Sequence, residues 1–600
     1  MREHLIVDIY RRLYGSERKY ISEVLKQIEG AFNEDKAPLV FFEAPTGYGK
    51  TAIAQVLSLY SLLNSEHFYK VIHVLPMRTI IDDVIKKTRA LFREFFGLGE
   101  KEDNLLTAFV AGQSMDHDDV FFLDAPYTVT TFDTFLMSSM KLNPKMMSRI
   151  DRELSYGYDY YTLGSICSSF IIFDEVQYVL DYAITGERLD EYSLPKIFMG
   201  VISYLIESNV PLIFMSATMP NVFVEYVVKK VLKGNKTQYE QIVMTHHDKK
   251  FSPEYDNDRP SGKAIVEKNS FISEKDVLEI AKEHIESSRK VLIVRNSPKR
   301  AIATFRELKE MGYRGVLIHG KLTPEDRKNS LEAFKDAQFM VSTQVVEAGV
   351  DISANTLITD PAPISSIIQR AGRIARYDRG EEGAVFIVKD GFYLPYNEGI
   401  VKLSLKILVD AITKGNVDLH SYDDTKNLIE RIYSEEKTQG TLKRVVPLPA
   451  VGKIITFPNI RSSDVRNKMI SEFLSKRSFI RELLLPCYVV PDNISSDPKK
   501  IAEYILNKAS TENTLSISMR ELRQLAQNGG GIYILKYRIH EEKDKRKDLE
   551  MIPIENISER IIQWDRAFIR DLIVGNMVIL IKENDYIQGL GPRWIQDDRE

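Results

Sequence analysis

Short apolar runs recur along the first part of the chain, and stretches with the composition of helices separate them. Most of the runs are rich in Val, Ile and Phe; they occupy 38–44, 70–75, 127–132, 169–175 and 211–218. Strands that are buried on both faces of a parallel sheet have this continuous apolar pattern, whereas half-exposed strands alternate. Residues 52–63 and 80–96 are typical of helices between such strands. The alternation predicts a doubly wound α/β domain with a parallel sheet.

The same pattern restarts after a polar stretch at 233–263, where Pro, Gly, Asn and Asp cluster as they do in linkers. The second set of predicted strands lies at 290–296, 315–320, 339–344, 355–360 and 383–390. Beyond Asp418 the pattern loosens into predicted helices at 463–485, 498–508 and 518–527 and predicted strands at 531–537 and 577–582. We therefore expect an N-terminal helical segment (1–35), two α/β domains (36–250 and 251–417) and a mixed, mainly helical C-terminal domain (418–600).

Composition excludes several classes of protein. The chain has 600 residues, of which 44% are hydrophobic and 28% charged, an ordinary globular balance that rules out a disordered or fibrous protein. The net charge is −4, so any nucleic-acid contact must use a local groove. Two cysteines, Cys167 and Cys487, cannot build a metal cage or a disulfide framework, and we expect reduced thiols in a cytoplasmic protein. No apolar run approaches the ~18 residues of a membrane span.

The strongest local motif is a glycine-containing loop between the first predicted strand and the helix that follows it. A loop in this position cradles phosphates with its backbone N–H groups and the helix N-terminus. Lys50 would bridge the terminal phosphates, and Thr51 would offer its hydroxyl to Mg²⁺. The alternative is an ordinary strand–helix turn, and Ala44 stands where such loops normally begin with glycine. The candidate nucleotide-binding residues are Ala44, Pro45, Thr46, Gly47, Tyr48, Gly49, Lys50 and Thr51.

Two acidic residues end the apolar run at 169–175. Asp174 is a candidate Mg²⁺ ligand, and Glu175 is a candidate general base that orients and deprotonates an attacking water. Acidic pairs at strand ends also arise by chance. Here the pair follows a candidate phosphate-binding loop, which favours the catalytic interpretation.

Arginines spaced three apart occur in QRAGRIAR, 369–376, within the second α/β domain. This spacing predicts that they lie on one face of a helix. A rigid guanidinium matches the charge that phosphoryl transfer spreads over the phosphate oxygens. Arg373 and Arg376 would reach from the second domain to a nucleotide held by the first, so that hydrolysis requires closure. We include Gln369, which opens the motif, among the candidate catalytic residues; the alternative is a solvated basic helix.

In order and spacing, these motifs resemble those of superfamily 2 nucleic-acid translocases: APTGYGKT (44–51), FDEVQ (173–177), SAT (216–218) and QRAGRIAR (369–376). The resemblance covers about 36–380 and implies two tandem RecA-like domains, ATP and Mg²⁺ as cofactors and single-stranded DNA as a partner. Four further motifs, at 74–80, 129–133, 294–301 and 342–353, match as well. They imply nucleic-acid contacts from Arg78, Thr79, Thr130, Thr131, Asn296 and Thr343, and nucleotide contacts from Gly349 and Asp351.

Within the superfamily, DEVQ (174–177) and LIHGKLTPEDR (317–327) resemble the DNA helicase of type I CRISPR interference. This implies an ATP-dependent DNA helicase of antiviral defence that works with a crRNA-guided surveillance complex. Members often carry a fused HD nuclease domain, but His-Asp dipeptides occur here only at His117-Asp118 and His247-Asp248, where there is no room for one. We expect a helicase-only subunit served by a separate HD nuclease.

Other functions stay open on the sequence alone. A repair or RNA-remodelling helicase would have the same motifs, and an ATP-gated clamp would bind nucleic acid without unwinding it. The upstream Gln that usually reads adenine lacks its usual pattern here, and Gln27 is a candidate beside an ordinary helix-surface role. The basic stretch at 461–477 is either a strand-guiding element or a charged helix.

Overall fold

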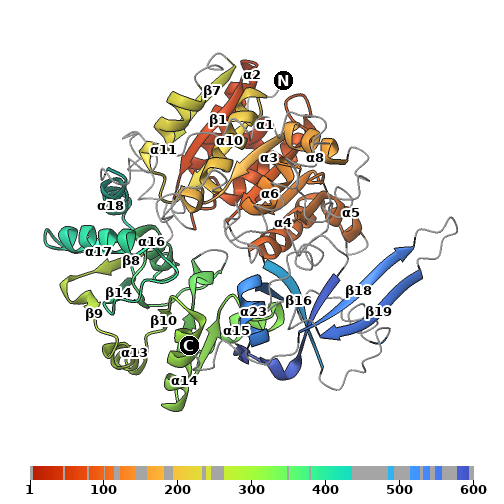
Figure 1. Ribbon diagram of the computed structural model, residues 1–600. Coiled ribbons are helices and arrows are strands. Elements are labelled where there is room, and N and C mark those ends of the chain that lie inside the picture. Colours follow the sequence, from red (N-terminus) through yellow and green to blue (C-terminus); the bar gives the residue numbers. More distant parts are fainter. Residues whose placement is uncertain are drawn as a thin grey trace. The chain divides into compact units, whose positions relative to one another are not determined.

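The structure is a computed structural model of residues 1–600 (Figure 1). It describes residues 5–44, 47–76, 80–99, 102–113, 122–141, 158–180, 194–232, 238–244, 262–347, 350–377, 380–434, 484–491, 500, 514–527, 532–540, 548–556 and 577–593. The chain divides into two compact units. The first comprises Met1–Asn143, Gly157–Val277 and Val346–Met469, and the second comprises Pro144–Tyr156, Leu278–Val345 and Ile470–Glu600.

A seven-stranded parallel sheet forms the centre of the first unit, with strand order β3-β4-β2-β5-β6-β1-β7. Its strands are β1 (Ala37–Glu43), β2 (Lys70–Leu75), β3 (Val110–Gln113), β4 (Tyr127–Thr131), β5 (Ser169–Phe173), β6 (Leu212–Ser216) and β7 (Tyr239–Met244). All five strands predicted here from apolar runs are present. β3 and β7 were not predicted from the sequence; they lie at the two edges of the sheet.

Helices cover both faces of this sheet, because successive strand residues point to opposite sides. On one face, Val40 and Phe42 pack with the N-terminal helices and with α3 and α4. On the other face, the ring of Phe214 lies 5.4 Å from those of Phe41 and Phe173, and Phe198 of α10 packs against the same group. The helices are α1 (Leu5–Tyr14), α2 (Lys19–Asn33), α3 (Thr51–Leu63), α4 (Ile81–Phe96), α5 (Asp103–Phe109), α6 (Phe132–Ser139), α8 (Tyr158–Cys167), α10 (Leu194–Glu207) and α11 (Asn221–Tyr226).

The rest of the first unit carries further strands in the order β13-β14-β8-β15, with β9 paired to β14. These pairs are parallel except for β8 with β15, which is antiparallel. The elements are β8 (Lys263–Val266), β9 (Phe271–Ile272), β13 (Thr356–Thr359), β14 (Glu382–Val388), β15 (Val417–Asp418), α16 (Ile364–Ala371), α17 (Glu398–Ile412) and α18 (Tyr422–Ser434).

The second unit contains three parallel strands in the order β11-β12-β10 and a five-stranded mixed sheet in the order β17-β16-β20-β18-β19. Its elements are β10 (Val291–Val294), α14 (Pro298–Glu310), β11 (Gly315–Ile318), α15 (Pro324–Ala333), β12 (Phe339–Ser342), β16 (Leu484–Val490), β17 (Thr514–Ser518), α23 (Met519–Gln527), β18 (Ile532–His540), β19 (Asp548–Asn556), β20 (Met577–Lys582), β21 (Tyr586–Ile587) and β22 (Gly591–Pro592). α13 (Asp276–Glu286) begins in the first unit and continues in the second.

The α/β class and the parallel sheets are confirmed, and the C-terminal region is mixed as expected. Strands rather than helices form most of its described part after α18, and β16, β17 and β19 were not predicted. β16 pairs with β17 and β20, which lie far from it in the sequence, so local patterns signal it weakly. The helices expected at 463–485 and 498–508 lie almost wholly outside the described residues. The boundaries expected between domains stay a prediction.

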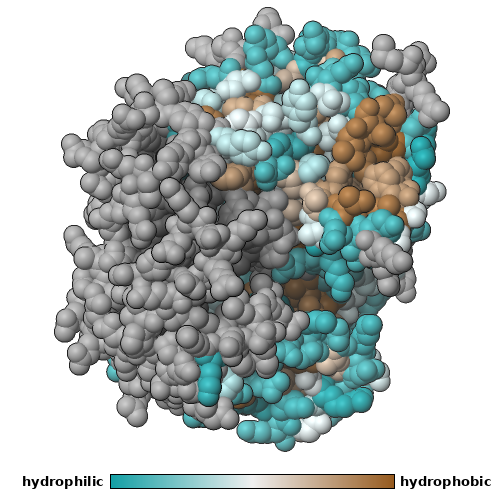
Figure 2. Space-filling view, turned by 90° about the vertical axis from the view of Figure 1, so that its right-hand side faces the viewer, coloured by the Kyte–Doolittle hydropathy of each residue, from teal (hydrophilic) through white to brown (hydrophobic). Residues whose placement is uncertain are grey.

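On the face shown in Figure 2, apolar patches lie among hydrophilic residues. Every helix in the described ranges is too short or too polar to span a lipid bilayer. Cys487 is buried and Cys167 is partly buried, and neither forms a disulfide.

The aromatic layer behind β5 and β6 should carry much of the stability of the first unit. Phe214→Ala removes a side chain that contacts Phe41, Phe173 and Phe223, and we expect it to lower the free energy of unfolding by about 3–5 kcal/mol. Leu62→Ala, at a position that is 50% exposed, is the matched control and should cost about 0.5 kcal/mol or less. Urea denaturation of both variants checks this, and equal costs would contradict it.

Candidate active site

The glycine-containing loop joins β1 to α3 as the sequence predicts. Gly47 and Gly49 have φ of +83° and +94°, a backbone region that residues with a Cβ rarely adopt. A Cβ on Gly47 would lie 3.4 Å from Nε of Arg376. Pro45 and Thr46 lie outside the described residues. The loop therefore turns tightly and brings the N-terminus of α3 to the carboxyl edge of the sheet.

A residue of the N-terminal segment, Arg18, contacts this loop. Tyr48 is fully buried, and the guanidinium of Arg18 lies over its ring at 5.1 Å. Arg18 also donates hydrogen bonds to the carbonyl oxygens of Gly47 and Tyr48. The main chain of the loop is thus held by a side chain that the sequence analysis did not single out.

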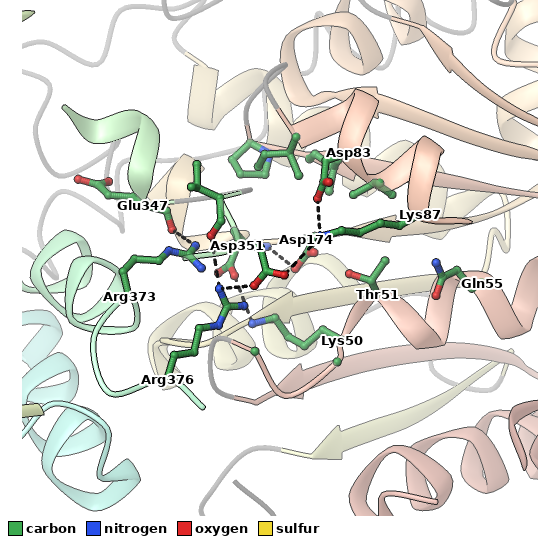
Figure 3. Close-up of a pocket in the computed structure, with 18 of the residues that line it drawn as sticks. Lys50, Thr51, Gln55, Asp83, Lys87, Asp174, Glu347, Asp351, Arg373 and Arg376 are labelled. Atoms are coloured by element: carbon green, nitrogen blue, oxygen red, sulfur yellow. Dashed lines mark hydrogen bonds and ion pairs between the residues drawn. The ribbon is translucent and has the colours of Figure 1, made fainter. Parts of the chain in front are cut away.

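A cavity of about 500 Å³ opens in front of the loop, within the first unit (Figure 3). Residues from the loop and α3, from the end of β5 and from the segments around 350 and 375 line it. The candidate site residues among them are Gly47, Gly49, Lys50, Thr51, Asp174, Glu175, Asp351, Arg373 and Arg376. The structure therefore brings together most of the described residues expected to handle the nucleotide.

Lys50 and Glu175 form the central ion pair of this cavity. Lys50 is only 7% exposed; its Nζ lies 3.2 Å from Oε1 of Glu175 and donates a hydrogen bond of 3.1 Å to the carbonyl oxygen of Ala44. Glu175 follows β5 with a φ of +54°, an unusual conformation for a residue with a Cβ. Such strained positions persist where the surrounding structure fixes them. The ion pair and the turn fix the carboxylate beside the lysine.

Asp174 lies on the other side of the same turn. Its Oδ1 accepts a hydrogen bond from the Glu175 amide, and its Oδ2 lies 3.5 Å from Nε2 of His73. Burial acts to raise the pKa of Asp174, but nearby His73 and the positive charge of Lys50 outweigh it, so that the pKa is lowered. An ionised carboxylate and the hydroxyl of Thr51 are hard oxygen donors of the kind that Mg²⁺ prefers.

A chain of polar contacts leads from Glu175 to the end of β6. Gln177 donates through Nε2 to Oε2 of Glu175 at 2.7 Å, and its Oε1 accepts from the hydroxyl of Ser216 at 2.6 Å. The Ser216 oxygen also accepts from the amide of Thr218. In the sequence, Ser216 and Thr218 are recognisable only as part of a motif, and no role was predicted for Gln177. The feature of the sequence that could have pointed to Gln177 is its position, two residues after the acidic pair.

The arginine motif does not form a single helical face, which corrects the prediction. Helix α16 ends at Ala371, and Ile374 pairs with Ala354 in an isolated β-bridge, so the chain leaves the helix before Arg373 and Arg376. Only Arg370 of the three lies on the helix. It is fully buried, with contacts to Glu347, Thr359, Asp360 and Tyr396.

Arg373 and Arg376 both reach the cavity from the segment after α16. Arg373 is 4% exposed and donates to the carbonyl oxygens of Val346 and Glu347, at 2.8 and 2.7 Å. Burial and the neighbouring Arg376 lower the pKa of Arg373 to about 10, which leaves it charged at neutral pH. Arg376 Nη1 lies 3.2 Å from Oδ1 of Asp351. Tyr377 also donates to Asp351, so this carboxylate is held beside the arginines.

Several cavity residues were missed by the sequence analysis. Lys87 of α4 lies 2.9 Å from Asp83 and 3.8 Å from Asp351, and it lines the cavity (Figure 3). Tyr14 donates to Gln55, and both lie at the cavity as well. In the sequence, Asp83 and Lys87 look like an ordinary i,i+4 surface pair, so nothing there distinguishes them.

Other predicted residues do not meet at the cavity. Gln369 is half-buried on α16 and is not among the described residues that line it. Gln27 donates to Glu23 on its own helix.

The described nucleic-acid candidates are buried: Thr130 donates to the Gln113 carbonyl, Thr131 caps α6, and Asn296 and Thr343 are each 3% exposed. Arg78, Thr79 and Gly349 lie outside the described residues.

Two family models match the chain. Residues 22–226 match the DEAD/DEAH box helicase model, and residues 287–379 match the C-terminal model of the CRISPR-associated nuclease/helicase Cas3. The chain is 22% identical over 447 residues to the CRISPR-associated helicase Cas3 of Thermoproteus tenax, covering 72% of this chain and 68% of that protein. It is 24% identical to the Cas3 nuclease/helicase of Methanothermobacter thermautotrophicus, covering 67% of this chain and 46% of that protein.

The fold agrees with these sequence matches. The crystal structure of T. fusca Cas3 with AMPPNP superposes with a TM-score of 0.59 at 14% identity, covering 96% of this chain and 68% of that one. This likeness shows the tandem RecA-like layout that the motifs predict. In its motifs, its family matches and its fold, the chain resembles the CRISPR-associated Cas3 helicases.

Proposed function

We propose that this protein is an ATP- and Mg²⁺-dependent translocase on single-stranded DNA that unwinds duplex DNA. One observation carries the proposal: a single cavity is lined by the loop lysine, the acidic pair and the two arginines, which come from distant parts of the sequence. A phosphate-binding lysine, a carboxylate beside it and two guanidinium groups are the set that hydrolysis of a nucleoside triphosphate requires.

The Lys50–Glu175 pair suggests how binding prepares hydrolysis. A buried ammonium needs a negative partner, and Glu175 supplies it at 3.2 Å. The terminal phosphates of ATP carry more negative charge and would take over the lysine. Glu175 would then be free to accept a proton from the attacking water, which is the role of a general base.

Thr51 and Asp174 would hold Mg²⁺, and the lowered pKa of Asp174 keeps the carboxylate ionised for this purpose. The ion, when bound, neutralises charge on the phosphate oxygens. Arg376, which lies against Gly47 of the loop, and Arg373 would stabilise the charge that develops during transfer. Asp351, Gly349 and the remaining loop residues would complete the nucleotide contacts, and Gln369 would assist from α16.

We further propose that the chain acts in CRISPR interference, in the cytoplasm, with a crRNA-guided surveillance complex and a separate HD nuclease. Its Cas3-like family matches and the names of its relatives support the role in CRISPR interference. For the strand itself, Arg78, Thr79, Thr130, Thr131, Asn296 and Thr343 stay the proposed contacts. The buried threonine hydroxyls would contribute only after local rearrangement, so backbone groups of the same segments are the more direct candidates.

Removing the central ion pair should stop hydrolysis without unfolding the protein. We expect Lys50→Ala and Glu175→Gln each to reduce ATP turnover by about 10²-fold or more, because each removes a group that acts in the transition state. Glu175→Gln should still bind ATP, measured by equilibrium titration. Lys402→Ala, an exposed lysine that pairs with Glu398, is the control and should turn over normally. Wild-type hydrolysis by Lys50→Ala would refute the ATPase assignment.

Strand specificity and unwinding can be tested together. We expect single-stranded DNA to stimulate ATP hydrolysis more than single-stranded RNA, and we expect displacement of a labelled strand from a tailed DNA duplex that requires ATP and Mg²⁺. Removal of Mg²⁺ with EDTA should abolish both signals. Preference for RNA would favour an RNA-remodelling helicase. Hydrolysis without displacement would favour an ATP-gated clamp, and metal-dependent cleavage by the single chain would contradict a separate nuclease.

A further inference from the structure

A buried cluster of charged groups lies behind the phosphate-binding loop, away from the cavity. Its centre is Glu43, the last residue of β1, which is 2% exposed. Oε1 of Glu43 accepts a hydrogen bond from the amide of Met219 at 3.0 Å, and Oε2 accepts one from the hydroxyl of Tyr422 at 2.8 Å. Nζ of Lys426 lies 3.0 Å from Oε2. Both oxygens of the carboxylate are therefore in use.

The partners of Glu43 come from α18, far along the chain. Lys426 is 7% exposed, donates to the carbonyl oxygen of Met219 at 2.6 Å and lies 3.2 Å from Oε1 of Glu430. Glu430 in turn accepts from the amide of Asn221 at 2.9 Å. Three residues on one face of α18, at positions 422, 426 and 430, thus hold both the end of β1 and the segment 219–221.

Stability alone does not account for a buried ion pair at this place. Taking both charges out of water is costly, and apolar residues of similar size often serve as well. Burial raises the pKa of Glu43 despite the opposing charge of Lys426, which reflects that cost. Unlike an apolar contact, the cluster fixes the relative geometry of its residues, because each hydrogen bond has a defined direction.

The two segments held by α18 lead directly to the catalytic groups. Glu43 immediately precedes the loop that carries Lys50. Met219 follows Ser216, which bonds Gln177 and through it Glu175. The cluster therefore joins the chain leading to the lysine with the chain leading to the carboxylate. None of its members is among the described residues that line the cavity.

We propose that Glu43, Tyr422 and Lys426 are positioning residues, through which α18 sets the loop of Lys50 against the segment of Ser216 and Glu175. ATP hydrolysis then depends on a helix whose side chains do not contact the nucleotide. This inference rests on the proposed ATPase function. α18 follows the second α/β region in sequence. Through it, the C-terminal half of the chain contacts the carboxyl edge of the first sheet, where the proposed catalytic residues lie.

The test compares a single and a double variant of the buried pair. Lys426→Met removes the charge at similar length and should lower kcat for DNA-stimulated ATP hydrolysis by about tenfold, with KM for ATP changed less than about threefold. Glu43→Gln/Lys426→Met removes both charges and should recover most of kcat. Lys402→Met on α17, an exposed lysine that also pairs with a glutamate, is the matched control and should leave kcat unchanged.

Rates are normalised to folded protein, measured by titration with a fluorescent ATP analogue, so that a loss of stability alone would leave kcat intact. If Lys426→Met is too unstable to measure, Tyr422→Phe deletes only the hydroxyl bonded to Glu43 and should lower kcat about threefold. Unchanged kcat in these single variants, or no recovery in the double variant, would overturn the inference. The proposed function is tested separately. It stands if the wild-type chain hydrolyses ATP and Lys50→Ala does not, whatever the variants of the buried pair show.

Discussion

The site depends on one electrostatic constraint: the ammonium of Lys50 is almost out of contact with water and must have a negative partner. At 3.2 Å, Glu175 is that partner. In an interior of low polarity such a pair interacts far more strongly than at the surface, but it also pays for desolvation of both groups. A polyanionic phosphate would compete for the same lysine. Under the proposed function, the charge balance of this buried side chain would link nucleotide binding to the release of Glu175 as a general base.

The parallel sheet makes this arrangement possible. β1, β5 and β6 are neighbours, so their carboxyl ends meet at one edge and deliver Lys50, Asp174 and Ser216 to the same place. Ligands bind at this edge in open α/β sheets because loops and helix N-termini converge there. Glu175, with φ of +54°, and Gly47 and Gly49 of the loop adopt backbone conformations that are rare for residues with a Cβ. They occur where the chain must turn sharply from strand to site.

The sequence predicted the centre of the fold better than its periphery. Strands buried on both faces, such as β1 and β5, are continuous apolar runs, and their short length favours a strand over a helix. The short edge strand β3 and the alternating β7 lack this signal, and β16 pairs with β17 and β20, which lie far from it in the sequence. The cavity residues Lys50, Asp174 and Glu175 follow from motifs, whereas Gln177 and Lys87 acquire their contacts only through tertiary packing. The buried Thr130 shows that a motif position does not predict exposure.

The arginine motif shows most clearly why spacing alone could not give the site. Arg370, Arg373 and Arg376 are spaced three apart, yet one is locked in a buried network, one is held by two carbonyl oxygens and one faces the loop. The helix ends between the first and the second, because the chain passes into the bridge of Ile374 with Ala354. Arg370 fixes the helix end and Glu347, and Glu347 offers its carbonyl oxygen to Arg373. The three arginines of the motif are therefore not equivalent: Arg370 is part of the scaffold and, through Glu347, helps to place Arg373, whereas Arg376 is held separately beside Asp351.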